Sequence, residues 1–345
     1  MLAAFTLVML TGNLIKFAEL VIAKGVNILD ILRLLLYLIP YLFSFTIPMA
    51  ALLAIVMAFG RLSSDFELIA MRASGIAPIR LIVPILTACL VLSAGVLALQ
   101  NYVVPRSHLA FRRQLKVIGI KQPTAYLEAG TFLKGFPPYI IFVYEIDGQE
   151  LSQVRIYEPK PNGPTRTIVA NRGEFEPLPG NRGVTLTLYD GNIDEWDPER
   201  PGSLYKVVFG SYSIVLRSDA EAASQIRKKL KEMTFQELAQ EQQRMDAERI
   251  ETLPIELETH RRIAGSFATF VFGFFGLAMG LRTHHHERLI TFVWVLGIFI
   301  TYYLASAATN ALALKGWLPP WLAMWWPNML GSGLGATQLW RALRW

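Results

Sequence analysis

Three charged residues lie in or directly after an otherwise apolar stretch near the start of the chain. Lys16, Glu19 and Lys24 interrupt the run 2–23, which is long enough to cross a bilayer. A charge at that depth costs at least a few kcal/mol on insertion scales, so these residues are candidates for ligand binding. A lysine placed there could hold the head of an anionic, phosphorylated lipid. Two structural alternatives stay open: Lys16 and Glu19 can neutralise each other on one helix face, or the lysines can extend to the headgroups.

A short polar segment, SSDFELIAMRASG, has the pattern of a complete small helix. Ser64 and Glu67 match the S-x-x-E capping box, and a cap of this kind contributes about 1 kcal/mol. Gly75 can adopt the left-handed conformation that closes a helix, and Pro78 prevents continuation. The sequence therefore predicts a helix from Ser64 to Ser74.

The apolar residues of this predicted helix fall on one face and need a partner. They follow the spacing i, i+3, i+4, i+7 and are Phe66, Ile69, Ala70 and Ala73. Because a helix of about ten residues is marginal alone in water, the stripe must pack on the bilayer surface, on its flanking spans or on another protein. The polar face offers Asp65, Glu67 and a single cation, Arg72, which disfavours a lipid surface. Glu67 is then either a helix cap alone or the contact of a helix that docks in the groove of a cytoplasmic partner.

Sequence signatures of catalysis and of metal or nucleotide binding are scarce. The motifs G-x-x-x-x-G-K-[ST], H-E-x-x-H and G-x-S-x-G do not occur in the sequence. The run His284 to Glu287 does not predict a metal site, because adjacent residues on one element do not converge on one ion. Cys89 is the single cysteine, so an intrachain disulfide is excluded and packing inside a span is expected. We therefore expect a non-catalytic protein with no cofactor or metal of its own.

Two G-x-x-x-G pairs mark places where helices can approach closely. Gly276 and Gly280 form one pair, and Gly331 and Gly335 form the other. Packing within the chain is favoured over a seam between subunits, although the spacing fits both.

The composition requires that much of the chain lies in lipid. The 345 residues are 53% hydrophobic and 17% charged, with a mean hydropathy of +0.36, which is too apolar for an ordinary soluble protein of this length. Windows of about 20 residues indicate six candidate spans. These are 2–23, 32–59, 81–104, 263–281, 289–313 and 321–340.

Basic residues in the short connections predict the orientation of the spans. They gather on one side, which should be cytoplasmic, and are Arg61, Arg72, Arg80, Arg282, Arg288, Arg341 and Arg344. The segment 107–258 has no apolar run long enough to cross and falls on the opposite side, which is the periplasm in a bacterium. The predicted parts are residues 1–106 with three spans, 107–258 outside the membrane, and 259–345 with three more spans.

The outer segment has the pattern of β structure followed by a helical connector. From Ala125 to Leu216, β-branched and aromatic runs such as YIIFVYEI alternate with turn signals such as KPNGP. Strands at this spacing favour an antiparallel sandwich, jelly roll or barrel. Thr234 and Glu237 form a second capping box, which opens a polar helix that is either a solvated connector or a signalling element. The expected fold is an α-helical membrane protein with six transmembrane helices and an inserted all-β, jellyroll-like periplasmic domain.

Several stretches resemble one family of transport proteins. IPYLFSFTIPMAALLA, RLSSDFELIAMRASGI and the later LETHRRIAGSFATFVFGFFGLAMGLR are similar to the LptF/LptG family, the membrane subunits of the ABC transporter that extracts lipopolysaccharide from the inner membrane. The order of three spans, a periplasmic insert and three spans also matches. The stretch Glu258 to Arg262 and the KEMTFQEL connector resemble the F-type subunit more than the G-type. Relatives usually carry a basic amphipathic segment before the first span, whereas this sequence begins within the span.

The resemblance implies partners and residue roles. A homologous G-type permease, a dimeric cytoplasmic ATPase that holds ATP and Mg²⁺, and periplasmic jellyroll bridge proteins would assemble with the chain in the bacterial inner membrane. Lipopolysaccharide would be the substrate, and the jellyroll would pass it on. Residues 64–74 match the family's coupling helix, and Glu67 matches its acidic contact with the ATPase. Lys16, in Ile15-Lys16-Phe17, matches a basic residue that lines the lipid cavity and meets lipid A phosphate.

Two other classes of protein compete with this interpretation. One is a membrane-anchored envelope receptor or assembly protein whose β domain binds a ligand without transport. The other is an integral membrane enzyme, which the missing motifs disfavour. Nothing in the sequence indicates a nucleic-acid partner. Co-purification with a soluble ATPase would separate a transport subunit from both alternatives.

Overall fold

The computed structural model shows two compact units. The described residues are 2–22, 25–121, 130–136, 138–147, 150–159, 165–178, 183–196, 204–217, 228–281 and 288–343. The helical unit comprises Met1–Gly12, Leu36–Leu109 and Lys228–Trp345. The sheet unit comprises Asn13–Leu35 and Ala110–Arg227. Three of these boundaries fall within α1 (Leu2–Ile22), α2 (Ile28–Ser64) and α5 (Val104–Lys121), so these helices contribute residues to both units.

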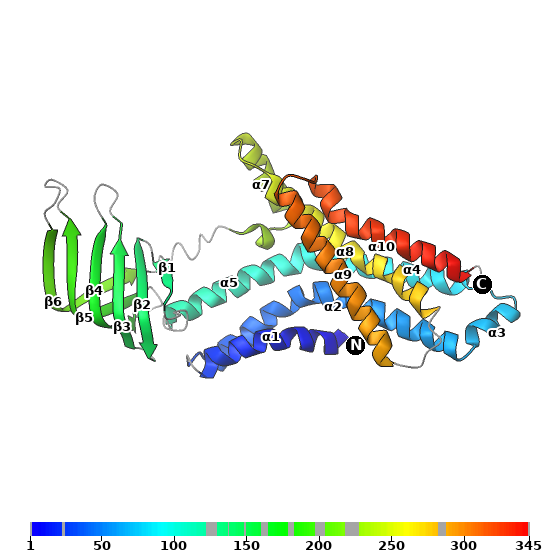
Figure 1. Ribbon diagram of the computed structural model, residues 1–345, viewed down its shortest axis with the longest axis horizontal. Helices are drawn as coiled ribbons and strands as arrows, with labels where there is room; N and C mark the ends of the chain where they lie inside the picture. The colour runs from blue at the N-terminus through cyan, green and yellow to red at the C-terminus, as the bar shows by residue number, and fades with distance from the viewer. Residues whose placement is uncertain are drawn as a thin grey trace. The chain divides into compact units, whose positions relative to one another are not determined.

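Long helices form where the sequence has long apolar runs (Figure 1). Within the described ranges, five helical stretches are long and apolar enough to cross a membrane, as is typical of a multi-pass membrane protein. They contain α1 (Leu2–Ile22), α2 (Ile28–Ser64), α4 (Ile79–Ala98) continued by the π-helical turn η1 (Leu99–Val103) and α5 (Val104–Lys121), then α8 (Leu253–Gly280) and α9 (Arg288–Leu314). The third stretch stays helical to Lys121, well past residue 106, where the sequence predicts that the outer domain begins.

The sixth predicted span, 321–340, is helical but less apolar than the other five. It lies in α10 (Pro320–Leu343), which has 24 residues but does not reach the hydropathy of the five stretches. Asn328, Gln338 and several Gly and Trp residues lower its hydropathy. The described part of the helical unit also contains three shorter helices: α3 (Glu67–Ala73), η3 (Leu230–Glu232) and α7 (Phe235–Ala247).

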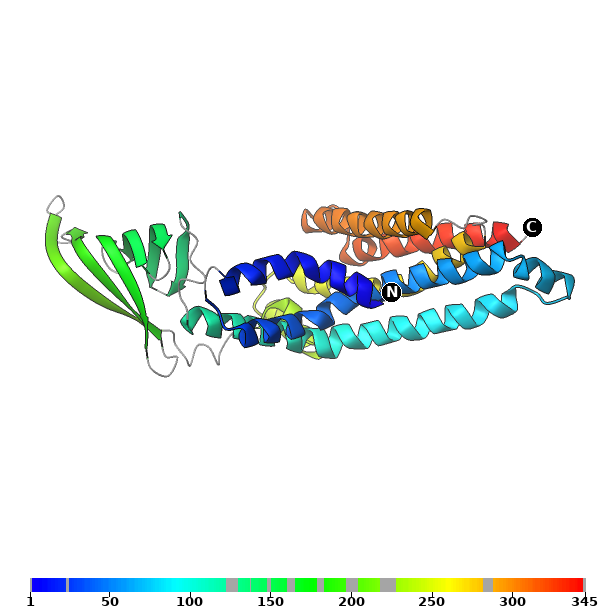
Figure 2. The same cartoon turned by 90° about the horizontal axis from the view of Figure 1, so that it is seen from below.

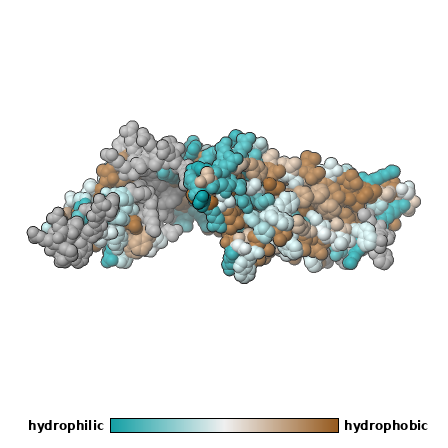
Figure 3. Space-filling model, turned by 90° about the horizontal axis from the view of Figure 1, so that it is seen from above, coloured by the Kyte–Doolittle hydropathy of each residue, from teal (hydrophilic) through white to brown (hydrophobic). Residues whose placement is uncertain are grey.

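Helix α8 forms the centre of the helical unit because its small residues let other helices approach. Gly276 faces α2, and Gly273 faces the buried Cys89 of α4. Gly331 of α10 faces Val271 of α8. The outer surfaces remain apolar, and the helical part of the molecule carries broad hydrophobic surface on the face shown in Figure 3. Lipid contact explains such a surface, because a hydrocarbon environment does not penalise exposed apolar side chains.

The predicted β region forms a single antiparallel sheet of six strands in the order β1-β2-β3-β4-β5-β6. Each described strand pairs with its neighbour in the chain, so the sheet is a meander and lacks the crossover connections of a Greek-key jelly roll. The expectation of antiparallel β structure is confirmed, whereas the jellyroll order is not. The strands are β1 (Phe132–Phe136), β2 (Tyr139–Asp147), β3 (Glu150–Glu158), β4 (Arg166–Pro177), β5 (Gly183–Trp196) and β6 (Leu204–Arg217).

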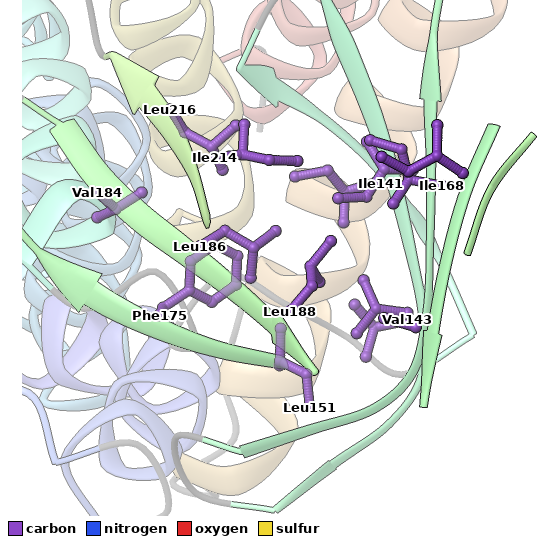
Figure 4. Packing of buried hydrophobic residues seen from close by; sticks show 14 residues of the cluster. Ile141, Val143, Leu151, Ile168, Phe175, Val184, Leu186, Leu188, Ile214 and Leu216 are labelled. Carbon is purple, nitrogen blue, oxygen red and sulfur yellow. The ribbon is translucent and has the colours of Figure 1, made fainter. Parts of the chain in front are cut away.

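The sheet encloses its own core because its long strands curve (Figure 2). Side chains from β2 to β6 point toward one interior, where Leu151, Leu186 and Leu188 are fully buried (Figure 4). Fourteen buried residues form this core. A core of this kind lets the sheet fold without a disulfide.

A line of residues across the sheet interrupts the alternation of buried and exposed side chains. In β3, Leu151 and Val154 are both buried, although they are three residues apart and should face opposite sides. Gln153 between them has a φ of 53°, and Asp190 of β5 has a φ of 51°. The paired residues on either side of Gln153 and Asp190 show that the two lie on one line that runs across neighbouring strands. We call this line the crease. It is formed by Tyr144, Gln153, Asn171, Asp190 and Gly210. On the two sides of the crease, each strand from β2 to β6 turns opposite faces toward the core.

Candidate functional site

The predicted docking helix forms, but it begins later than the sequence suggests. α2 continues through Ser64, and α3 spans Glu67–Ala73. The capping box at Ser64 is therefore wrong: Ser64 Oγ donates to Arg61 O at 3.0 Å, and α3 has no side-chain cap at its start. The end of α2 stays helical because it is tied to α8, where the Ser63 hydroxyl donates to Leu281 O at 3.4 Å.

The two ends of α3 use left-handed backbone conformations. Phe66, at its start, has a φ of 57°, which is rare for a bulky residue and costs about 1–3 kcal/mol. At the other end Gly75 has a φ of 79°, and its N–H donates to Arg72 O at 3.0 Å. The N–H of Ile76 donates to Met71 O at 2.9 Å, which completes a Schellman motif. The predicted closure of the helix at Gly75 is confirmed.

The apolar stripe of α3 is exposed, and a different residue anchors the helix. Leu68 is 7% exposed and packs against the chain, whereas Phe66 and Ile69 are 68% and 59% exposed. Ala70, Ala73 and Glu67 are exposed as well. The stripe does not pack on the flanking spans, so the bilayer surface or another protein must cover it. α3 lies at one end of the helical unit between α2 and α4 (Figures 1 and 2).

The acidic residues of α3 and its junction, Glu67 and Asp65, also face outward, whereas Arg72 is half-buried. Asp65 pairs with Arg61 at 3.4 Å, and their side chains are 43% and 81% exposed. An exposed pair of this kind contributes little to stability. The negative charge of Glu67 is therefore available at the surface beside the stripe.

The charged residues of α1 are exposed and do not neutralise each other. Lys16 and Glu19 are both exposed, and the described residues show no ion pair between them. Phe17, which lies between them, is 7% exposed and faces the opposite way. Lys24, the third predicted lipid contact, lies outside the described residues.

The four glycines of the G-x-x-x-G pairs all lie at contacts within this chain. A Cβ on Gly276 would lie 2.9 Å from Ile55, and one on Gly280 would lie 2.5 Å from Phe59. These two contacts join α8 to α2. On α10, a Cβ on Gly331 would lie 2.6 Å from Val271, and one on Gly335 would lie 2.8 Å from Phe274, both on α8. Such distances exclude a side chain unless the neighbouring helix moves.

A buried arginine, for which the sequence predicts no role, joins α8 to the connector. Arg262 is 3% exposed, and its Nε donates to Glu258 Oε1 at 2.9 Å. Its two remaining nitrogens donate to Met233 O at 2.6 Å and to Leu230 O at 2.8 Å. Arg261 bonds the other Glu258 oxygen at 2.6 Å and 3.0 Å. The signal that could have indicated this cluster is the spacing of Glu258 to Arg261 and Arg262, which is i+3 and i+4 on one helix.

The connector is held at a second point, where the π-helical turn interrupts the third span. The N–H of Phe235 donates to Asn101 Oδ1 of η1 at 2.8 Å. Single π-helical turns inside α-helices are frequent at functional positions. Arg262 of α8 and Asn101 of the π-helical turn thus both bond the connector, which leads into α8.

The predicted capping box at the start of α7 is confirmed. Thr234 Oγ1 accepts from the Glu237 N–H at 3.3 Å, and Glu237 Oε2 accepts from the Thr234 N–H at 2.8 Å. The hydrogen bond from Lys228, together with that from Thr234, holds the pKa of the Glu237 carboxyl below its usual value, although partial burial acts in the opposite direction. The cap is therefore strongest with Glu237 ionised.

The described ranges show no group of three or more His, Cys, Asp or Glu side chains arranged to hold a metal ion. The run His284 to Glu287 lies outside them. Nothing in the geometry above forms a nucleophile and base pair, and the exposed stripe of α3 suits docking rather than chemistry.

Comparison with known proteins identifies the family. The sequence model of the lipopolysaccharide export system permeases LptF/LptG matches residues 1–343. The chain belongs to the LptF/LptG family. This family consists of transport permeases, in agreement with the missing catalytic motifs, and its model covers F-type and G-type members together.

A relative of this LptF/LptG chain occurs in Rickettsia prowazekii (strain Madrid E). The uncharacterized protein RP871 is 24% identical over 287 residues, which cover 82% of the present chain and 78% of RP871. A match over this share of both chains includes helices as well as sheet. RP871 is itself uncharacterized, so the family match carries the functional assignment.

Proposed function

We propose that this LptF/LptG chain is a permease subunit of an ATP-driven transporter that extracts lipopolysaccharide from the bacterial inner membrane and passes it toward the outer membrane. The observation that supports this most strongly is the family match over residues 1–343. The substrate in this proposal is that of the family.

The proposed topology has six spans, with α10 as the sixth. Its 24 residues would extend about 36 Å at 1.5 Å per residue, enough for a hydrocarbon core of about 30 Å. α10 packs closely on α8 through its own paired glycines, Gly331 and Gly335. Polar residues on such a helix are tolerated because neighbouring helices cover them. With basic connections on the cytoplasmic side, the sheet lies in the periplasm.

Helix α3 is proposed as the coupling helix that docks on a dimeric cytoplasmic ATPase. The exposed stripe of Phe66, Ile69, Ala70 and Ala73 fits the helix-in-groove mode of recognition, and Glu67 would meet a cation of the partner. ATP and Mg²⁺ would bind on that ATPase, since the sequence of this chain has no G-x-x-x-x-G-K-[ST] motif. Ser64, Asp65, Arg72 and Gly75 would shape and close the docking segment.

The remaining assignments concern the other partners. The proposed assembly contains a homologous G-type permease, with the present chain as the F-type subunit. β1 and β6 are the edges of the described sheet, and open edges can pair with a strand of a periplasmic bridge protein. Lys16, Glu19 and Lys24 remain the proposed contacts to the anionic lipid.

Affinity purification of the full chain tests the docking proposal. The wild-type chain should retain a soluble ATPase and a second permease. Glu67→Ala should weaken the association with the ATPase about tenfold, which corresponds to the loss of one charge-assisted hydrogen bond. Glu251→Ala, which removes an exposed carboxylate outside α3, should not change it.

Two outcomes would contradict the proposal. If Glu67→Ala retains the ATPase and ATP-dependent release of lipopolysaccharide, the docking assignment of α3 is wrong. If the wild-type chain retains neither an ATPase nor a second permease, the transport function itself is wrong, and an envelope receptor or assembly protein becomes the better explanation.

A further inference from the structure

A cavity inside the helical unit has no role in the proposed function. It encloses about 250 Å³ between α2, η1, α5, η3, α8, α9 and α10. Since one water occupies about 30 Å³ in the liquid, the space holds several waters or one compact polar group, but not a lipid with several acyl chains.

The cavity wall carries a polar atom that lacks a hydrogen-bond partner. Ser44 of α2 lines the cavity and is 6% exposed. Its hydroxyl makes no hydrogen bond to any part of the chain that the structure describes. A buried hydroxyl without a partner costs free energy, so a ligand that accepts its proton would remove a penalty.

Positive charge exceeds negative charge among the lining residues. Lys231, Arg261 and Arg262 are the cations, and Glu258 is the only anion among them. Both arginines bond the Glu258 carboxylate, and each guanidinium nitrogen of Arg262 already donates to a partner. Arg261 commits only Nε and Nη2. Its Nη1 and the Lys231 ammonium have no bonded partner within the described ranges, so the cavity retains unneutralised donors.

Further donors come from α9 and α5. Tyr303 and Asn310 line the cavity from α9, and the described residues offer no hydrogen bond to the Tyr303 hydroxyl. His108 of α5 lies against the Tyr41 ring, with ring centroids 4.9 Å apart, and also lines the cavity. Polar side chains from α2, α5, η3, α8 and α9 thus line one space. A planar carboxylate cannot reach donors on so many sides, whereas a tetrahedral phosphate presents oxygens in every direction.

We propose that this cavity binds a phosphate group, either free or at the end of a lipid headgroup. The bound phosphate accepts hydrogen bonds from Ser44, Lys231 and Arg261 and thereby links the connector at η3 to α2 and α8. The two surplus cations match the charge of a phosphomonoester. Lys16 is not among the residues that line the site, and the proposal does not depend on the transport function.

The test uses the full chain, purified in detergent with the subunits that accompany it, and inorganic phosphate as the probe. Thermal unfolding in sodium phosphate is compared with sodium chloride at equal ionic strength. A parallel set uses nanodiscs of phosphatidylcholine with and without phosphatidic acid. Phosphate or phosphatidic acid should raise the unfolding temperature, and the apparent affinity follows from the concentration dependence.

Three variants make the test specific. Lys231→Gln should weaken binding about tenfold, and Ser44→Ala about fivefold, as expected for one charged and one neutral hydrogen bond. Arg244→Gln removes one positive charge on α7, where Arg244 pairs with Glu241 at 2.8 Å outside the cavity, and should leave binding unchanged. Without phosphate, Ser44→Ala should unfold at the wild-type temperature or above it, which separates lost binding from misfolding.

The outcomes distinguish the two sources of phosphate. Stabilisation by inorganic phosphate assigns a free anion, and stabilisation by phosphatidic acid alone assigns a lipid headgroup. The proposal is overturned if neither probe stabilises the chain, or if Lys231→Gln and Ser44→Ala respond as Arg244→Gln does. Because no transport is measured, this failure is distinct from failure of the proposed function.

Discussion

At the residue scale, Arg262 couples two segments that lie far apart in the sequence. Its guanidinium satisfies two backbone carbonyls of the connector and one buried carboxylate of α8. A buried charge is tolerated only when its hydrogen bonds are made. Loss of any one partner therefore leaves the other groups buried without a hydrogen bond, which costs free energy.

Replacement of Arg262 should therefore destabilise the chain strongly. In Arg262→Leu, Glu258 stays buried with one partner, and Leu230 O and Met233 O lose theirs. We expect a loss of about 3–5 kcal/mol, the usual cost of removing one member of a buried ion pair. Chemical or thermal unfolding of the purified chain in nanodiscs measures it.

The adjacent arginine provides the matched control. Arg261 bonds the same carboxylate, but its side chain is 39% exposed, so Arg261→Leu should cost no more than about 1 kcal/mol. Arg262→Lys should fall between the two, because an ammonium cannot reach three acceptors in a plane. Equal losses of stability in Arg261→Leu and Arg262→Leu would show that the hydrogen bonds from Arg262 to the connector do not stabilise the fold.

Gly280 permits the closest approach of α8 to α2. An added Cβ would lie 2.5 Å from Phe59 Cβ and 3.3 Å from Val56 O, so Gly280→Ala must separate the helices. We expect a destabilisation of about 1–3 kcal/mol, typical of overpacking. The same unfolding assay measures it.

Gly297 of α9 is the matched control, since a Cβ there meets nothing within 4 Å. Gly297→Ala should be neutral or stabilise by up to about 1 kcal/mol through helix propensity. If Gly280→Ala instead weakens only the association with a second subunit and leaves unfolding unchanged, Gly280 lies at a subunit seam.

At the scale of elements, α3 shows which end of a helix the sequence specifies. Gly75 closes the helix as predicted because glycine is the residue best able to adopt the required φ of 79°. The start could not be predicted, because S-x-x-E indicates a cap only if the chain leaves the preceding helix at the serine. Here the Ser63 bond to Leu281, 218 residues away, keeps α2 helical through Ser64.

The crease in the sheet was beyond prediction for a related reason. Each strand alternates as expected on either side of the crease, so the strand positions could be recognised from β-branched and aromatic residues. Gln153 and Asp190 adopt left-handed conformations at the crease. Neighbouring strands change there which face they turn toward the core, and these conformations keep the strands paired. Registers between strands are non-local, and single residues such as Gln153 carry no local signal for them.

The cap of α7 predicts a pH dependence of the connector. The pKa of Glu237 is lowered from its usual 4.5, so its stabilising contribution is complete above pH 4.5 and is lost as the pH falls through the lowered folded-state pKa. Amide hydrogen exchange of residues 229–247, corrected for intrinsic rates, should show reduced protection below pH 4.5. Glu237→Gln should lack this change.

Glu251→Gln is the control for the cap, because Glu251 is exposed and lies outside the capping box. It should lose protection with falling pH as the wild-type chain does. An unchanged pH dependence in Glu237→Gln would show that another carboxylate controls the connector.

At the scale of the whole molecule, hydropathy predicted most spans because lipid selects for length and apolar composition at once. Five of the six predicted spans largely coincide with helical stretches that are apolar enough to cross. The sixth, in α10, depends on packing: Gly331 and Gly335 fit against α8, and Asn328 Nδ2 donates to Ala264 O at 2.8 Å. Contacts of this kind hide polar groups from lipid, and no single-segment pattern reports them.

The topology gives the most demanding prediction for the molecule, and single-cysteine labelling can test it. Phe66, Val208 and Trp317 are 68%, 77% and 74% exposed, whereas Cys89 is only 2% exposed and can remain in place. Phe66→Cys probes α3, Val208→Cys probes the sheet, and Trp317→Cys probes the turn between α9 and α10. A membrane-impermeant maleimide is applied to cells with a permeabilised outer membrane, before and after lysis.

Val208→Cys and Trp317→Cys should react in intact cells, and Phe66→Cys only after lysis. The reason is that, in the proposed topology, an odd number of spans separates α3 from the sheet, and the basic connections lie with α3 on the cytoplasmic side. α9 then runs outward, which places Trp317 on the side of the sheet. Reaction of Phe66→Cys and Val208→Cys from the same side would contradict both the span count and the docking of α3, since an ATPase driven by cytoplasmic ATP cannot reach a helix in the periplasm.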